Sequence, residues 1–271
     1  MRALTTVDPG GDHLRLRGWR PIAEPPRFQR DAYEPQVVER AAASWSKLRE
    51  DERRSVAGAS LVAADLARLG APTEILGAAA RLIEDEVRHV EICGRVLEAL
   101  GAPSPGGPLP DLTDPLSGGQ AVGARCARML LAGFAVGEPM SAACFAAARR
   151  RTCEPLIRWA LTELLRDEAR HGPFGIHAGA WVVRSWTGEQ RRALWPECVA
   201  EMERVERSLG GPISATTTSE SPGSDGEDQA PRALESLGLL GPRANCEAAI
   251  AGIARLVLPP LAALGIVQGL T

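Results

Sequence analysis

Apolar residues recur every three or four positions through most of this 271-residue chain. That periodicity is typical of helices that bury one face. Helix starts are indicated by prolines in first turns, and helix ends by glycine- and proline-rich breaks. We therefore predict an all-α fold, with four long helices followed by additional C-terminal helices. The expected ranges are about 34–69, 73–100, 119–150, 153–185, 187–209 and 242–258.

Prolines interrupt three of the expected helices. Pro139 lies in the middle of the third, where it marks either a kink that packing tolerates or a local opening that positions a side chain or admits a ligand. Gly172-Pro173 is expected to bend or break the fourth helix, and Pro196 to kink the fifth.

The apolar stripes carry a few charged residues at positions that should face inward. On the first helix Glu52 falls in line with Leu48 and Val56, whereas Glu50 and Asp51 do not. A buried carboxylate is costly to keep ionised without a partner. A bound metal ion explains such a position economically.

A five-residue run in the second helix, Asp-Glu-Val-Arg-His at 85–89, returns as Asp-Glu-Ala-Arg-His at 167–171. Each copy follows an inward-facing glutamate by roughly thirty positions, and its Glu-x-x-His pair shares one helix face. This pattern predicts a two-metal site. The six candidate metal ligands are Glu52, Glu86, His89, Glu138, Glu168 and His171. The aspartate of each run can hold a metal-bound imidazole and the arginine can orient that aspartate, which adds four supporting residues: Asp85, Arg88, Asp167 and Arg170.

The donor atoms limit which metal is expected. Nitrogen and oxygen ligands without a thiolate favour iron or manganese over a structural zinc, and two such ions side by side can activate dioxygen. A single Glu-x-x-His is usually a surface pair, so the duplication on two apolar stripes carries the interpretation. His177 follows His171 by six positions, which does not place both on one face, and we interpret it as structural or exposed.

Bulk properties narrow the function classes. The net charge of −3 and the pI of about 5.9 argue against a nucleic-acid partner. No two of the six cysteines have Cys-x-x-Cys spacing, which fits a reducing cytoplasm. The N-terminal residues show no signal peptide. The apolar tail at 248–270 is interrupted by Arg255 and Pro259-Pro260, so no membrane span is expected.

Four regions are expected along the chain. These are an N-terminal arm at 1–33, a metal-binding helical bundle at 34–209, a low-complexity linker or loop at 210–232 and a C-terminal helix at 233–271 that packs on the bundle. The Pro/Gly-rich stretch 101–117 can span the length of a helix, which predicts a long crossover between the second and third helices.

The repeated pattern resembles the ferritin-like di-iron carboxylate superfamily, whose four-helix bundles include forms with one long crossover. Its D-E-x-R-H form is similar to that of the oxygenase and oxidase branches: bacterial multicomponent monooxygenase hydroxylases, arylamine N-oxygenases and relatives of acyl-carrier-protein desaturases. The resemblance covers about residues 34–185. The prolines at 139 and 173 depart from it, and so does the tail after residue 186.

The resemblance implies two iron ions, or one manganese and one iron. One ion would be held by Glu52, Glu86 and His89, and the other by Glu138, Glu168 and His171. Glu86 and Glu168 would be bridges, and the aspartates would pair crosswise, Asp85 with His171 and Asp167 with His89.

The implied function is a non-haem oxidase or oxygenase that uses dioxygen on a small organic substrate. It would act as a monomer or homodimer with an electron donor protein or reductant. The single tyrosine, Tyr33, lies far upstream of the ligands, which argues against a stable tyrosyl radical. One alternative is an iron-oxidising, iron-handling protein, because bacterioferritins share two Glu-x-x-His motifs, although they are much shorter. Another is a metal-stabilised bundle that binds a partner. Ala59, Ala142 and Ala169 either leave room for substrate or are plain core.

Overall fold

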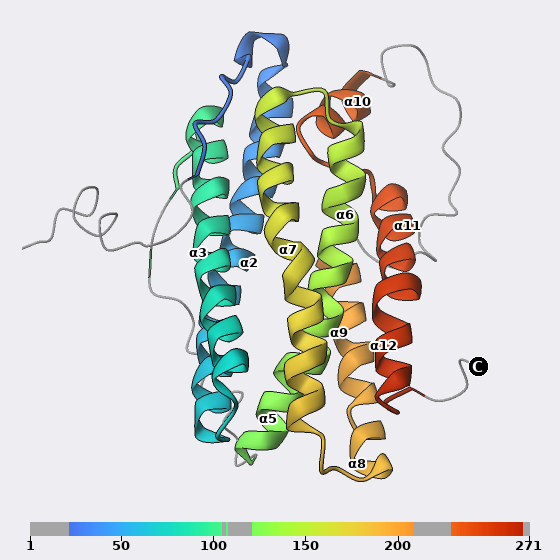
Figure 1. Cartoon of the computed structure of the whole chain (residues 1–271). Helices are drawn as coiled ribbons and strands as arrows, with labels where there is room; N and C mark the ends of the chain where they lie inside the picture. The colour runs from blue at the N-terminus through green and yellow to red at the C-terminus, as the bar shows by residue number, and fades with distance from the viewer. Residues whose placement is uncertain (1–21, 105–106, 108–120, 209–228, 268–271) are drawn as a thin grey trace, which may run out of the picture.

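The computed structural model describes residues 22–104, 107, 121–208 and 229–267 (Figure 1). Within these ranges all regular structure is helical, which confirms the predicted all-α class. The helices are η1 (Arg30–Ala32), α2 (Pro35–Arg68), α3 (Thr73–Leu100), α5 (Val122–Arg128), η2 (Met129–Gly137), α6 (Glu138–Arg151), α7 (Pro155–Val182), α8 (Gly188–Arg192), α9 (Trp195–Ser208), α10 (Gln229–Ser236), α11 (Pro242–Gly252), η4 (Ile253–Val257) and α12 (Leu258–Ala263).

The long helices lie side by side. α2 packs along α3, α3 on α7, and α7 on η2 and α6. Figure 1 shows α2 and α7 running in one direction and α3 and α6 in the other. The end of α3 and the start of α5 therefore lie at opposite ends of these helices. The crossover expected there, at 101–117, falls mostly outside the described residues.

Glycines in the left-handed conformation end the first two long helices. Gly70 follows α2 with φ 72°, and Gly101 caps α3 with φ 73°. Glycine adopts this conformation without the steric cost of a Cβ. Pro72 then precedes α3, so the chain reverses within a few residues and α3 returns along α2.

Two apolar clusters fill the interior, with a polar layer between them. One cluster includes Leu66 on α2, Leu82 on α3 and Leu130 on η2. The other includes Trp45 on α2 and Leu97 on α3. On α2, α3 and α7 alike, the residues of one cluster precede the candidate metal ligands and those of the other follow them. The candidate site is thus enclosed by apolar packing along the helix axes.

The third long helix is irregular. It contains the nine-residue π-helix η2, and Glu138 with Pro139 begins α6 directly after it. A proline has no N–H to donate and its ring crowds the preceding turn. A widened π turn removes that conflict, and such turns are frequent at functional sites.

A buried bidentate ion pair connects α5 to α2. Arg125 donates from Nε and Nη2 to the Asp65 carboxylate at 2.8 and 2.5 Å.

The fourth long helix excludes a break at Gly172-Pro173, one of the two outcomes expected there. α7 is not broken at Gly172-Pro173 but continues from Pro155 to Val182. Packing offsets the backbone hydrogen bond that Pro173 cannot make. Gly175 lies so close to η2 that a Cβ there would be 2.6 Å from the backbone nitrogen of Ala135. The contact with η2 and α6 therefore holds the proline-containing turn in the helix.

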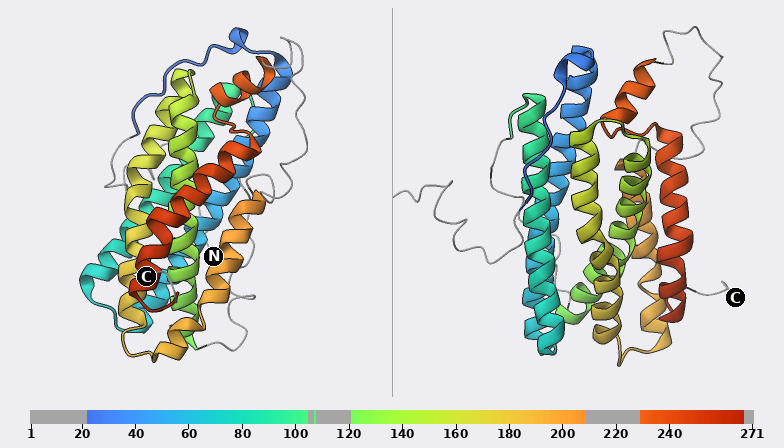
Figure 2. Two further views of the ribbon diagram at one scale, coloured as in Figure 1. Left: turned by 90° about the vertical axis from the view of Figure 1, so that its right-hand side faces the viewer. Right: turned by 45° about the horizontal axis from the view of Figure 1, so that its top comes forward.

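The C-terminal region differs from expectation in its boundaries. The helix expected at 187–209 is two helices, α8 and α9, because the chain breaks before Trp195 and Pro196 occupies a first-turn position. α10 begins at Gln229, inside the expected linker at 210–232, most of which is outside the described residues. The last helix, α11 with η4 and α12, runs past the expected end at 258 to Ala263 and lies along α6 (Figure 2). Pro259 and Pro260 fall in the first turn of α12, where prolines are tolerated.

Two helical stretches are long and apolar enough to cross a membrane by length and composition. In Val122–Arg151, 56% of the apolar window is buried, and in Pro242–Ala263, 28% is buried. Core helices of soluble proteins pass the same test, so this is weak evidence. The cytoplasmic location stays a prediction.

Candidate metal centre

The six candidate ligands converge from four helical elements. Glu52 comes from α2, and Glu86 and His89 from α3; Glu138 is the first residue of α6, and Glu168 and His171 come from α7. Two groups stand out in which one ligand atom of each residue lies within 4.8 Å of the others. One is Glu52, Glu86 and His89, and the other is Glu86, Glu138 and His171. Glu86 belongs to both.

Two carboxylates each face both imidazoles. Glu86 Oε2 lies 3.7 Å from His89 Nδ1 and its Oε1 lies 3.2 Å from His171 Nδ1. Glu168 Oε1 lies 3.4 Å from His89 Nδ1 and its Oε2 lies 3.2 Å from His171 Nδ1. Each carboxylate thus turns one oxygen to either side, which is the arrangement of a bridge between two cations.

The other two glutamates each face one imidazole. Glu52 Oε2 is 3.3 Å from His89 Nδ1, and Glu138 Oε2 is 3.8 Å from His171 Nδ1. The ring centroids of the histidines are 5.4 Å apart. Five of the six residues are buried; Glu138, with a side chain 16% exposed, is the most accessible.

The outer nitrogens of the histidines face aspartates in the crosswise arrangement that the resemblance implied. His171 Nε2 lies 3.5 Å from Asp85 Oδ2, and His89 Nε2 lies 3.8 Å from Asp167 Oδ2. A carboxylate on this side favours the tautomer with a proton on Nε2. The lone pair of each Nδ1 is then directed at the glutamates.

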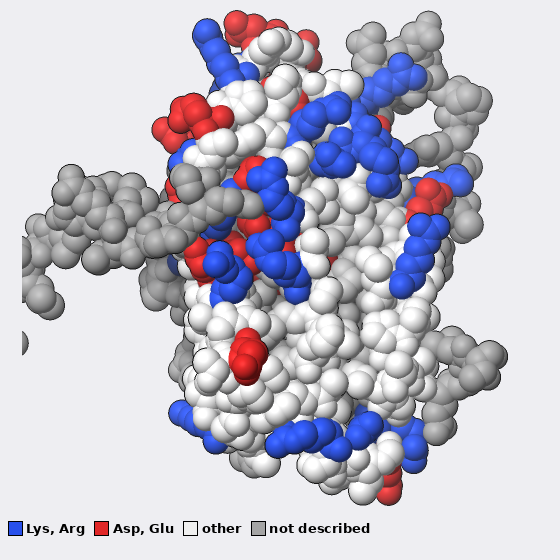
Figure 3. Space-filling model, in the orientation of Figure 1, with Lys and Arg blue, Asp and Glu red and all other residues white. Residues whose placement is uncertain are grey.

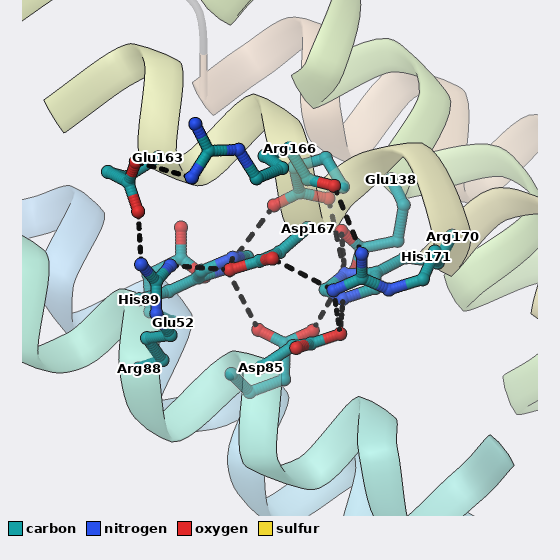
Figure 4. Close-up of polar contacts among 12 residues, drawn as sticks. Glu52, Asp85, Arg88, His89, Glu138, Glu163, Arg166, Asp167, Arg170 and His171 are labelled. Atoms are coloured by element: carbon teal, nitrogen blue, oxygen red, sulfur yellow. Dashed lines mark hydrogen bonds and ion pairs between the residues drawn. The ribbon is translucent and has the colours of Figure 1, made fainter. Parts of the chain in front are cut away.

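Arginines fix both aspartates (Figure 4). Arg88 Nη1 donates to Asp167 Oδ2 at 2.7 Å. Arg170 Nη2 donates to Asp85 Oδ2 and to Asp167 Oδ1, both at 2.8 Å. The four supporting residues therefore form one hydrogen-bonded set across α3 and α7.

Sequence reasoning missed one member of this set. Glu163 on α7 is buried and accepts hydrogen bonds from Arg88 and, at 2.8 Å, from Arg166 (Figure 4). It lies four positions before Asp167, so the two carboxylates share a helix face. That spacing was the available signal, but the partner, Arg88 on another helix, is decided only by packing.

Burial and mutual repulsion perturb the carboxylates. Burial raises the pKa of Glu168 to about 7, and the charge of Glu138 adds to this effect. Burial also raises the pKa of Glu86 well above its usual range. Burial acts to raise the pKa of Glu138 as well, but the His171 imidazole beside it lowers the pKa overall. Negative charge is thus crowded into a dry space that demands compensation.

The carboxylates around the two imidazoles favour the protonated, positively charged form of each ring. Burial acts to lower the pKa of His89, yet Glu52 and Glu86 raise it well above its usual range. Burial likewise opposes protonation of His171, and Glu168 and Asp85 reverse that effect on its pKa. Without metal ions, protons on the histidines supply the positive charge that the carboxylates require. Metal ions would displace those protons.

Several buried atoms of the candidate ligands have no hydrogen-bond partner within the described ranges, and they indicate whether two metal ions fit the site. Both oxygens of Glu86, Oε2 of Glu168 and Nδ1 of His171 are buried and make no hydrogen bond among the described residues. Each of these groups is a metal ligand in its deprotonated form. Four carboxylates also balance the charge of two divalent cations. The residues therefore fit two ions bound by nitrogen and oxygen.

Two further residues stand apart from the centre, as expected. The exposed His177 donates from Nδ1 to the Pro173 carbonyl at 2.8 Å. The Tyr33 hydroxyl lies 3.1 Å from a Glu154 oxygen and 3.0 Å from Ser236 Oγ, away from the six ligands.

Comparison of this chain with protein-family models, with curated proteins and with solved structures found no match.

Proposed function

We propose that this chain is an oxygen-activating oxidase or oxygenase. It would hold two iron ions, or one iron and one manganese, at the six-residue centre and act on a small organic substrate. We also propose that α2, α3, η2 with α6, and α7 form a ferritin-like four-helix bundle with a long crossover between α3 and α5. The antiparallel packing of these helices and the two inward Glu-x-x-His pairs support this assignment.

The observation that carries the proposal is the placement of Glu86 and Glu168. Each carboxylate presents one oxygen to each of two histidines whose ring centroids are 5.4 Å apart. A single-ion site needs no such symmetric arrangement, whereas a two-ion site uses it to hold both cations together. The absence of sulfur ligands favours iron or manganese. A pair of such ions, when bound, supplies the redox chemistry that activates dioxygen.

The chain's own residues would provide position and a dry environment. The two apolar clusters exclude water from both ends of the site. Asp85 and Asp167 keep the imidazoles oriented, and Arg88 and Arg170 hold the aspartates. Glu138, next to the π-helix, is the least enclosed ligand, so it lies on the side from which a substrate can approach. Turnover would need an electron donor protein or a reductant.

Anaerobic titration with ferrous iron tests the proposal. We expect two ions per chain, a Mössbauer spectrum of high-spin ferrous iron with nitrogen and oxygen ligands, and uptake of dioxygen after exposure to air. A panel of small organic compounds should then include one whose oxidation is coupled to oxygen uptake. Absence of metal uptake would refute the proposal. A very large shell on a sizing column, with mineralised iron, would favour the iron-handling alternative.

A further inference from the structure

Two cavities meet α7 beside the candidate centre. One, of about 440 Å³, lies between α3 and α7 and ends on Asp85, Arg170 and His171. The other, of about 360 Å³, lies between α6, α7 and the C-terminal helix and ends on Glu168. They flank the same turns of α7, since both include Ala169. We call them the α3 cavity and the C-terminal cavity.

We propose that the C-terminal cavity binds the substrate of this centre and selects a small, neutral, apolar molecule. This inference rests on the proposed function, because it assigns a ligand class to the same site. The outer wall of the cavity comes from the last helix, through Leu256 and Pro260. That helix lies outside the region that carries the repeated metal motif.

The inner end of the C-terminal cavity is a candidate metal ligand. Glu168 is 4% exposed, and its Oε2 makes no hydrogen bond among the described residues, although His171 Nδ1 lies 3.2 Å away. A buried carboxylate oxygen left in this state points to a partner that completes the site. A molecule in this cavity would therefore lie directly beside the reacting centre.

The α3 cavity offers no comparable access. It ends on the Asp85–Arg170 ion pair and on His171, whose outer nitrogen Nε2 faces Asp85 at 3.5 Å. The inner nitrogen, Nδ1, points the other way, toward Glu86 and Glu168. A molecule there would be separated from the ligand carboxylates by an imidazole and a salt bridge.

The walls of the C-terminal cavity set the chemical class. Pro139, Ala142, Ile176 and Leu256 present apolar surface. No lysine or arginine occurs among the described residues that line it, and the histidine that does, His177, uses Nδ1 to donate to the Pro173 carbonyl. An anionic substrate would therefore meet Glu168 without a permanent counter-charge. Figure 3 shows the same character on the surface, where the area over the lower half of α7 and the C-terminal helix carries few charged side chains. A neutral apolar molecule is the ligand that gains most from this environment.

Small residues keep the cavity open. A Cβ on Gly172 would lie 2.7 Å from Cγ of Pro139, so α6 and α7 touch at that point. Beside this contact, Ala142 and Ala169 leave the space that larger side chains would fill. Two of the three alanines considered for this role thus line the cavity, whereas Ala59 is part of an apolar cluster.

The test uses the full chain, as purified and after anaerobic ferrous loading, with indole as a neutral probe and indole-2-carboxylate as its anionic counterpart. Binding is measured by calorimetry, and the location of indole by nuclear Overhauser effects to methyl groups. We expect contacts to Ile176 and Leu256, and binding of the carboxylate that is weaker by about tenfold or more. Contacts instead to Ile75 and Leu82, which line the α3 cavity, would overturn the proposal.

A matched pair of substitutions gives a second test. Ala142→Trp fills the C-terminal cavity and should weaken indole binding by about tenfold or more, whereas Ala78→Trp fills the α3 cavity and should leave it unchanged. If Ala142→Trp does not fold, Leu256→Trp at the mouth replaces it, since that side chain is 53% exposed. Unchanged binding in the folded C-terminal cavity variant would overturn the proposal.

Metal content, measured in parallel, separates the two claims. Indole bound at Ile176 and Leu256 in a chain that takes up no metal would refute the proposed function and still locate the apolar ligand. Normal metal uptake with no indole binding would refute the cavity assignment alone.

Discussion

Glu52, Glu86 and His89 stand on α2 and α3, two uninterrupted α-helices, whereas Glu138 directly follows a π-helix, and Glu168 and His171 precede a proline inside α7. The two halves of the candidate centre carry the same motif on different scaffolds. The α2–α3 half is closed. The α6–α7 half contains the more accessible Glu138 and borders the C-terminal cavity at Glu168.

The difference separates two physical tasks. Regular helices with consistent apolar faces hold ligands rigidly and bury them. Irregular turns cost backbone hydrogen bonds, yet they displace side chains and leave space between helices. In this chain the α2–α3 half would bind the metal ions. The α6–α7 half would bind them too and would also admit the substrate. Four experiments test this comparison.

The largest expected effect is on the residue that joins the halves. Glu86 faces both histidines, so Glu86→Ala should reduce metal content from two ions per chain toward none. Glu52→Ala, which removes a carboxylate near His89 alone, should leave one ion. Elemental analysis of the purified variants measures both.

The control for this experiment is Glu84→Ala on the same helix, because Glu84 pairs with Arg81 away from the centre. It should retain two ions. Equal metal content in Glu86→Ala and Glu84→Ala would show that Glu86 is not a bridge.

The next effect concerns the contact that holds α7 continuous. In Gly175→Ala the new Cβ would lie 2.6 Å from the Ala135 nitrogen and 2.7 Å from the Leu130 carbonyl oxygen. Because these are backbone atoms, a helix must shift, and we expect a loss of about 3 kcal/mol in the free energy of unfolding. Urea denaturation of the metal-free protein measures it. Wild-type stability would mean that the approach of α7 to η2 is looser than described.

A smaller effect, on metal affinity, is expected from removing the hydrogen bonds by which Arg170 joins the two halves. Arg170 binds Asp85 and Asp167, one behind each histidine, so Arg170→Gln should weaken metal affinity by about tenfold at both positions. Competition with a chelator measures this. Arg158→Gln is the matched control, because Arg158 is also exposed on α7 but donates to the Thr152 carbonyl, away from both aspartates. A loss confined to one ion would contradict the shared role.

The smallest expected effect is a gain in stability from a substitution in the α2–α3 half. Gly77 lies within α3, is exposed, and has no atom within 4 Å of where a Cβ would stand. Gly77→Ala should therefore stabilise the protein by about 0.5–1 kcal/mol, because alanine loses less conformational freedom in a helix. The sign is opposite to that expected for Gly175→Ala. Destabilisation in the same urea assay would indicate that α3 is strained near its start.

Helix periodicity was sufficient to place most of the candidate centre. Residues three and four apart share a face, so the position of Glu52 among apolar residues already indicates that it points inward. The repeat at 85–89 and 167–171 adds a second regularity of the same kind. The helix from 73 to 100 is found where its apolar pattern predicts it, and the all-α class follows from such patterns.

The periodicity of apolar residues identifies the buried face of each helix. It does not show which helices pack against one another through those faces. The pairing of Arg88 with Glu163 joins two helices, and nothing in either local pattern specifies it. The continuity of α7 through Pro173 likewise depends on contact with η2, which overrides the local tendency of proline to end a helix.

By itself the sequence determined which residues face inward and which donor atoms they bring, because both follow from spacing and residue type along one helix. Only the tertiary structure decided that Glu86 and Glu168 each face two histidines, that a π-helix precedes Glu138, and that the last helix walls a cavity at Glu168. Those features depend on the relative shift and rotation of helices far apart in the chain. Packing sets these quantities, and no local pattern encodes them.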